Sequence, residues 1–171
     1  MPGQEYSDPG TFLLSLQYYS SFAPSIAASA AAAAASCSWR AVQPPFAFGA
    51  YAYTTYITGM AYGVDIWAGQ IDVRLRKHKP ALHLIAAVPF RGFEDRWSTD
   101  WKRAYQELLE QADLVKCICP GYNAGAYQRR NEWMVDHSSR VIAVFNGEPS
   151  GTKNTIDYAK RNGVLCCYLE L

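Results

Sequence analysis

From Tyr53 onward, short and continuously apolar runs alternate with segments of helical pattern, and this alternation limits the chain to few folds. Runs such as "ALHLIAAVPF" and "RVIAVF" have no polar face, which is typical of strands covered on both sides of a parallel sheet. The segments between them suit the helices that connect parallel strands. The sequence therefore predicts an α/β fold, a Rossmann-like and doubly wound, mainly parallel sheet with helices on both faces.

The start and end of each run give the expected elements. The expected strands cover residues 11–19, 53–58, 81–90, 113–120, 140–145 and 164–171, and the expected helices cover 25–39, 65–78, 98–112, 126–138 and 152–163. Ser98 or Thr99 is a candidate N-cap, and Gly163 closes the last helix. Residues expected to lie mostly inward on helix 65–78 are Ile66, Ile71, Val73 and Leu75.

Charge divides the chain into two parts. Only Glu5, Asp8 and Arg40 are charged within the first 57 positions. We therefore expect residues 1–52 to be a divergent region rich in alanine and serine, either an atypical first strand-helix unit or irregular, and residues 53–171 to be the α/β core. Across the whole chain, 16 basic and 15 acidic residues give a net charge of +1, which makes a nucleic-acid partner unlikely.

Residues 11–39 carry no charge and could resemble a membrane or export segment. Alanine and serine dominate this stretch and Pro24 interrupts it, which disfavours a spanning helix. No Lys or Arg precedes it, which disfavours a secretory signal. We expect a cytoplasmic protein without a membrane partner.

The cysteines indicate neither a metal site nor a disulfide framework. Their number is odd, and they lack the paired C-x-x-C spacing of zinc sites. We expect small buried core residues in a reducing compartment. The residues concerned are Cys37, Cys117, Cys119, Cys166 and Cys167.

Two glycine-rich loops are expected at strand ends, where sheets of this kind bind ligands. In "GMAYGVD", Gly59 and Gly63 allow a tight turn close to a ligand, and the helix that follows presents its positive dipole end. Asp65 could cap that helix or accept a hydrogen bond from a ribose hydroxyl. In "NGEPSGTKNT", Gly147 and Gly151 alternate with hydroxyl side chains before another helix. Two such loops at one sheet edge predict an anion site.

Two further features have alternative explanations. Arg129 and Arg130 cannot both face the core, so one of them could grip a phosphate, or both could be solvated charges. Trp97 and Trp101 could stack on a base, although tryptophans at helical spacing are more often core residues.

Three segments carry a family resemblance. "TGMAYGVD" resembles the S-G-x-A-x-G-x-D loop of the SLOG superfamily, "QRRNEWMVD" its Arg-Asn helix, and "GEPSGT" its P-G-G-x-G-T loop. The segments follow the family's order over residues 53–171 and are most similar to the small, stand-alone YpsA-like members. The superfamily also includes DprA-like DNA-processing proteins and phosphoribohydrolases of the LOG type.

This resemblance implies binding or sensing of a nucleotide or a nucleotide-derived small molecule, with no cofactor and with a homodimer as a possible assembly. The phosphate would lie near Gly147, Ser150, Gly151 and Thr152, and Arg130 and Asn131 would line the same pocket. The other implied ligand-binding residues are Gly59, Met60, Ala61, Gly63 and Asp65.

The chain departs from the family in two places. Where the phosphoribohydrolases have a catalytic glutamate, this chain has Thr155, so no catalytic residue is assigned. Glu132, Asp136 or Glu148 could replace that glutamate. The T-G-H-R-P type loop of YpsA-like relatives is also missing, so either the first unit has diverged or residues 1–52 come from a displaced reading frame.

Three functions therefore remain open. Nucleotide binding or sensing is the leading one, and a nucleoside 5′-monophosphate phosphoribohydrolase is the alternative. A DprA-like role with single-stranded DNA is disfavoured by the near-neutral charge.

Overall fold

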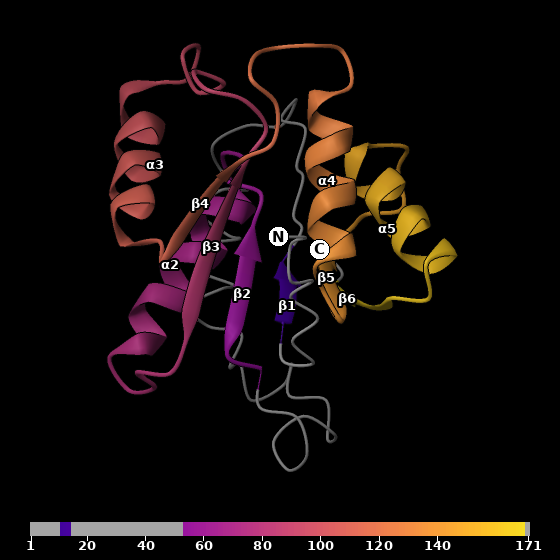
Figure 1. The fold of residues 1–171 in the computed structure, drawn as a ribbon, viewed down its shortest axis with the longest axis horizontal. Helices are drawn as coiled ribbons and strands as arrows, with labels where there is room; N and C mark the ends of the chain where they lie inside the picture. The colour runs from indigo at the N-terminus through magenta and orange to yellow at the C-terminus, as the bar shows by residue number, and fades with distance from the viewer. Residues whose placement is uncertain (1–10, 15–52, 170–171) are drawn as a thin grey trace, which may run out of the picture.

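The computed structural model describes residues 11–14 and 53–169, whose strands form a six-stranded sheet (Figure 1). Neighbouring strands are parallel throughout, and their order across the sheet is β4-β3-β2-β1-β5-β6. The strands are β1 (Thr11–Leu14), β2 (Thr55–Thr58), β3 (His83–Val88), β4 (Leu114–Cys117), β5 (Arg140–Val144) and β6 (Leu165–Leu169).

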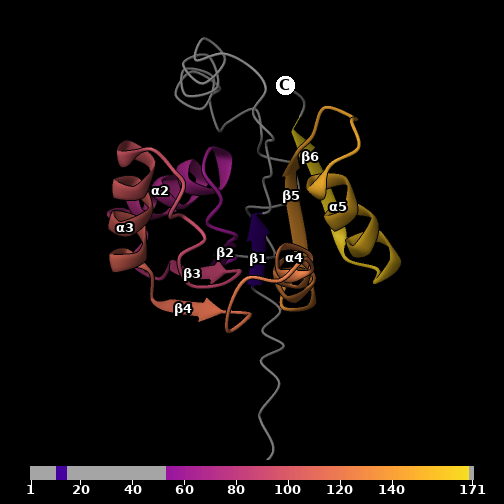
Figure 2. The same ribbon diagram turned by 90° about the horizontal axis from the view of Figure 1, so that it is seen from above.

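Helices cover both faces of this sheet (Figure 2). They are α2 (Val64–Arg76), α3 (Thr99–Gln111), α4 (Ala126–Asp136) and α5 (Gly151–Arg161). Because crossovers between parallel strands are right-handed, α2 and α3 lie on one face, and α4 and α5 lie on the other after the chain crosses back to β5. The predicted Rossmann-like α/β fold is confirmed. The expected helix 25–39 and Cys37 lie outside the described residues.

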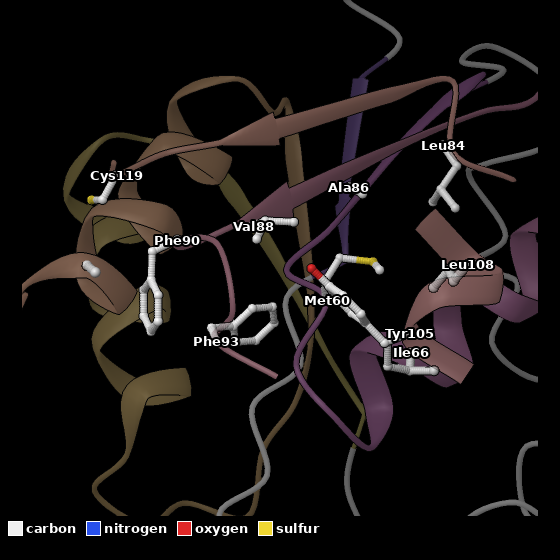
Figure 3. Packing of buried hydrophobic residues seen from close by; sticks show 11 residues of the cluster. Met60, Ile66, Leu84, Ala86, Val88, Phe90, Phe93, Tyr105, Leu108 and Cys119 are labelled. Atoms are coloured by element: carbon white, nitrogen blue, oxygen red, sulfur yellow. The ribbon is translucent and has the colours of Figure 1, made fainter. Parts of the chain in front are cut away.

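β3 shows how a continuously apolar strand supports two cores. Its alternate residues Leu84, Ala86 and Val88 join the cluster under α2 and α3 that Figure 3 shows. Ala87 faces the opposite way and packs with Met134 of α4 in a second cluster. A strand buried on both faces needs apolar residues at every position, which explains the pattern in the sequence.

The strand order reverses at β1, which pairs with β2 on one side and β5 on the other. The strands are parallel, so the loops that follow β2 and β5 open at the same edge of the sheet, which we call the carboxyl edge. Two strand spacings, about 10 Å, separate the ends of β2 and β5. A reversal of this kind is where open α/β sheets bind their ligands.

Several local expectations were wrong. All four residues of β4 are exposed, because this strand is at the margin of the sheet, and so Cys117 is exposed whereas Cys119 is buried. Cys166 and Cys167 are half-buried. On α2, Ile66 is buried and Ile71 and Val73 are half-buried, but Leu75 is 38% exposed and Asp72 lies inward.

The expected helix ends are mostly in place. Ser98 is the N-cap residue of α3, although its side chain makes no capping hydrogen bond. Gly163 follows α5 with a φ of 71°, the left-handed conformation that often terminates a helix.

Asp72 is a buried carboxylate in a small cluster of charged residues at the end of the strands opposite the carboxyl edge. Its Oδ2 lies 3.4 Å from Arg76 Nε, and neither Asp72 carboxylate oxygen accepts a hydrogen bond among the described residues. Arg76 Nη2 bonds instead to Asp113 Oδ2 at 2.7 Å, and His83 Nδ1 lies 3.5 Å from Asp113 Oδ1. Burial raises the pKa of Asp72 to about 6, against the opposing effect of the Arg76 guanidinium.

The raised pKa makes Asp72→Asn a stabilising substitution above pH 6. Between about pH 4 and 6 the folded state binds a proton that the unfolded state does not bind, so the contribution of Asp72 to stability falls as the pH rises through this range. We expect Asp72→Asn to raise the free energy of unfolding at pH 8 by up to about 3 kcal/mol, and by much less at pH 4. Urea denaturation at both pH values measures the difference.

Asp157→Asn serves as the control, because Asp157 is an exposed carboxylate paired with Lys153 and its pKa is lowered. It should give no gain at pH 8. An Asp72→Asn protein that is destabilised equally at both pH values would contradict the account of Asp72.

Candidate functional site

The loop after β2, residues 59–63, is held in an unusual backbone conformation; we call it the β2 loop. Met60 has a φ of 60° although its side chain is fully buried, and Gly63 has a φ of 91°. The Thr58 hydroxyl stabilises the turn, since its Oγ1 accepts a hydrogen bond from Met60 N (3.3 Å) and donates one to the Asp65 carbonyl (2.9 Å). A non-glycine residue with positive φ is uncommon and indicates that the surroundings fix the loop.

Asp65 secures the same loop from inside. It is the second residue of α2 and the N-cap is Gly63, so the first of the two alternatives for Asp65, a helix cap, was wrong. Its Oδ2 accepts a hydrogen bond from Ala61 N at 3.2 Å and lies 3.9 Å from Arg130 Nη1. Asp65 is 1% exposed, so its buried carboxylate stabilises the loop from within the protein.

Arg130 projects from the second turn of α4 and is also 1% exposed. Its Nη1 donates to the Gly59 carbonyl, and its Nε donates to Asn131 Oδ1 at 2.9 Å. Burial lowers the pKa of Arg130, and the neighbouring Asp65 carboxylate opposes that shift. Both donors are thus directed at protein acceptors, and the Nη1 bond joins α4 to the end of β2.

Gly59 is required by the same contacts. A Cβ atom at this position would lie 2.5 Å from Arg130 Nη1 and 2.6 Å from Asp65 Oδ2, closer than these atoms can approach. The glycine therefore leaves room for a buried ion pair, in addition to any approach by a ligand.

The loop after β5, residues 145–150, forms the second half of the candidate site; we call it the β5 loop. Gly147 has a φ of 90°, and Asn146 Oδ1 accepts a hydrogen bond from Glu148 N at 3.1 Å. Ser150 is the N-cap of α5, and its Oγ accepts from Lys153 N at 3.3 Å. α5 therefore begins at Gly151 with its N-terminus at the carboxyl edge.

Thr152 and Thr155 lie on the inner side of α5 and are both buried. The Thr155 hydroxyl donates to the Gly151 carbonyl at 2.9 Å, a bond within the helix. The position at which the resemblance would place a catalytic glutamate is therefore occupied by a buried hydroxyl that bonds to the backbone.

The other carboxylates considered from the sequence have different surroundings. Glu132 Oε1 accepts from Gln128 Nε2 at 2.9 Å, and Asp136 Oδ1 accepts from the Tyr158 hydroxyl at 2.9 Å. Asp136 is the last residue of α4, a helix whose N-terminus lies toward the carboxyl edge, so Asp136 is at the distant end. Among residues 11–14 and 53–169, no cluster of three His, Cys, Asp or Glu side chains could hold a metal ion.

Trp97 and Trp101 are half-buried and pack against the core under α2 and α3, which favours a role in packing for these residues over stacking on a base. Tyr62 of the β2 loop contacts both, with ring centroids 5.3 Å from Trp97 and 6.1 Å from Trp101. Sequence reasoning missed the other rings of this group, Phe90, Phe93 and Tyr105, although aromatic residues recur closely along residues 90–105.

The structure thus places the sequence-predicted residues in two groups on either side of β1. One group combines the β2 loop and the start of α2 with two residues of α4, and consists of Gly59, Met60, Ala61, Gly63, Asp65, Arg130 and Asn131. The other surrounds the start of α5 and consists of Gly147, Ser150, Gly151 and Thr152. Arg129, by contrast, is exposed.

The crowding at Gly59 gives a direct test of the buried ion pair. We expect Gly59→Ala to lower the free energy of unfolding by about 2–4 kcal/mol, because the added methyl group forces Arg130 away from its partners. Gly121→Ala is the matched control, since no atom of the described residues would lie within 4 Å of a Cβ there. Equal stability of the two variants in urea denaturation would contradict this account.

Comparisons with known proteins agree with this geometry. The family model YpsA, described as the YspA SLOG family, matches residues 49–163 and so includes both loops and α4. The SPbeta prophage-derived protein YoqJ of Bacillus subtilis (strain 168) is 37% identical over 118 residues, which are 62% of this chain and 69% of YoqJ.

More distant similarity extends to the UPF0398 proteins. That of Bacillus pumilus (strain SAFR-032) is 27% identical over 92 residues, 53% of this chain and 50% of its own length. BCB4264_A1614 of Bacillus cereus (strain B4264) is 28% identical over 106 residues, 60% of this chain and 58% of its own length. The chain thus spans between half and three fifths of these two relatives. On the match of the family model and on the similarity to YoqJ, this chain belongs to the YpsA family of SLOG proteins.

Proposed function

We propose that this protein binds a nucleotide or a nucleotide-derived small molecule at the carboxyl edge, across the end of β1. The observation that carries this proposal is the position of the β2 and β5 loops, which open at one edge where the strand order reverses. Each loop leads directly into the N-terminus of a helix, α2 or α5.

The phosphate is assigned to the β5 loop and the start of α5. The first N–H groups of a helix lack acceptors within the helix, and the helix dipole places positive charge there. Ser150 adds a hydroxyl, and Gly147 and Gly151 let an anion approach the backbone closely. Thr152 completes this half of the proposed site.

The rest of the ligand is assigned to the β2 loop and the start of α2, with Met60, Ala61 and Gly63 contributing backbone groups. Asp65, Arg130 and Asn131 support this half from below, because their contacts fix the loop before any ligand arrives. A loop that is already ordered loses little conformational entropy on binding.

A small ligand is favoured over a polynucleotide because the net charge is only +1, too little for binding that depends mainly on phosphate neutralisation. None of the described helices is long and apolar enough to cross a membrane. The proposal includes a cytoplasmic location and a homodimer. The exposed β4, where Leu114 and Val115 are 50% and 48% exposed, supports an interface between two copies.

Binding is favoured over hydrolysis because of Thr155. Cleavage of an N-glycosidic bond needs a carboxylate close to the sugar or the attacking water, and Thr155 instead donates its hydroxyl to the Gly151 carbonyl. The buried Asp65 carboxylate likewise accepts a hydrogen bond from Ala61 N and pairs with the Arg130 guanidinium.

The phosphate assignment is tested by exchanging Ser150 for two residues that both cap helices well. Ser150→Asp keeps the cap but places a negative charge beside the proposed phosphate, whereas Ser150→Asn keeps the cap without the charge. We expect Ser150→Asp to weaken AMP binding at least about 10-fold through charge repulsion, and Ser150→Asn to have a much smaller effect. Isothermal titration calorimetry gives both dissociation constants, and melting temperatures check the fold. Equal AMP affinity in both variants would contradict the assignment.

A second experiment separates binding from catalysis. After incubation of the protein with AMP, we expect intact AMP and no ribose 5-phosphate beyond that of a protein-free control, because no carboxylate stands at the Thr155 position. Release of ribose 5-phosphate over many turnovers, abolished by Arg130→Ala, would show a phosphoribohydrolase instead.

A further inference from the structure

A continuous chain of aromatic contacts runs from the β2 loop toward the N-terminus of α4. Tyr62 contacts Trp97, and Trp97 contacts Phe93, with ring centroids 5.3 and 4.9 Å apart. Phe93 in turn contacts Phe90 at 6.1 Å. Phe90 and Phe93 are buried just beyond the end of β3, in the cluster that Figure 3 shows.

This chain ends in two tyrosines, Tyr122 and Tyr127, which we call the tyrosine pair. Both meet Phe90 edge to face, with centroids 5.5 and 5.7 Å away and interplanar angles of 76° and 75°. Phe90 is 8% exposed, but Tyr122 is 73% exposed and Tyr127 is 41% exposed. One buried ring therefore orients two rings that remain accessible to solvent.

The loop that carries Tyr122 is ordered by Asn123. Its Oδ1 accepts from Gly125 N at 3.1 Å and from Arg129 Nη2, and its Nδ2 donates to the Gly121 carbonyl at 3.3 Å. These bonds fix the loop on both sides of Asn123, so an exposed ring is presented with little conformational freedom.

Tyr127 lies close to the candidate site along α4. It lies one turn before Arg130 on α4, about 4.5 Å along the helix axis, and Arg130 bonds to the Gly59 carbonyl. The Tyr127 hydroxyl is near enough to affect the pKa of Arg130. The tyrosine pair thus lies at the carboxyl edge, on the β3 side of the β2 loop.

We propose that the tyrosine pair is the stacking site for the base of the nucleotide, a role that rests on the proposed function. The face of an aromatic ring binds a purine or pyrimidine ring by stacking, and a tyrosine hydroxyl allows the ring edge to stay in water. Polar Asn123 and the exposed Arg129 lie beside the tyrosine pair, so polar groups border the two exposed rings. A flat base would contact the rings while its polar edge stayed near these groups.

The test compares AMP with ribose 5-phosphate, which has the same phosphate and sugar but no base. Dissociation constants are measured by calorimetry for the full chain and for Tyr122→Ala and Tyr127→Ala. We expect each substitution to weaken AMP binding by about 5- to 100-fold, as for the loss of one stacked base, and to leave ribose 5-phosphate binding unchanged. Tyr168→Ala is the matched control, because Tyr168 is a comparably exposed tyrosine (44%) on β6.

A second measurement does not depend on truncating a ring. Tyr122→Trp retains an aromatic face at the proposed contact, and its added fluorescence relative to the parent chain should be quenched by AMP but not by ribose 5-phosphate. Tyr127→Phe should retain AMP binding, because stacking requires the ring and not the hydroxyl.

The outcomes separate the two proposals. If the parent chain binds AMP and ribose 5-phosphate equally, or if the alanine variants weaken both ligands alike, the stacking role is wrong while phosphate binding stands. If the parent chain binds neither probe, the proposed function fails and the stacking role fails with it.

Discussion

The guanidinium of Arg130 is the point on which the rest of the site depends. A charge this deeply buried is strongly unfavourable unless acceptors surround it, and here the acceptors are the Gly59 carbonyl, Asn131 Oδ1 and the nearby Asp65 carboxylate. Gly59 and Arg130 are 71 residues apart in sequence, so this one group joins the end of β2 to α4 across the fold. Loop and helix are therefore expected to form and be lost together.

That connection explains how the β2 loop keeps its strained backbone. Met60 adopts a positive φ although it has a side chain, a conformation that persists only when its neighbours stabilise it. The Met60 side chain is buried in the same cluster as Ile66, Val88 and Phe93. The Thr58 hydroxyl accepts a hydrogen bond from the Met60 N–H. The packing of the Met60 side chain and the hydrogen bond to its N–H together fix one conformation of the β2 loop. A loop held in this way offers backbone groups to a ligand without first having to order itself.

The sequence predicted the fold and the position of both loops, because continuously apolar strands and glycine-rich junctions are local signals. It failed where burial depends on the whole sheet. β4 begins with the apolar residues Leu114 and Val115, and its exposure results from its position at the margin of the sheet, of which Lys116 was the one local sign. On α2, hydropathy predicted Leu75 inward, but the helix turns Asp72 to the interior. The contacts of Arg130 could not be predicted for the same reason, since its partners on the β2 loop are remote in sequence.

The bonds of Arg130 to protein acceptors also affect how the proposed ligand would be bound. Its Nη1 and Nε bond to protein acceptors, and Lys153 in the first turn of α5 is paired with Asp157 at 2.5 Å. Under the proposed function, the phosphate is then neutralised mainly by helix N–H groups, which carry partial charges, instead of by a dedicated cation. Backbone N–H groups of this kind contact the phosphate and do not contact the base of a nucleotide. Selectivity for a nucleotide would have to come from contacts with the base, and in the described part of the chain the tyrosine pair, held by Phe90, is well placed to make them.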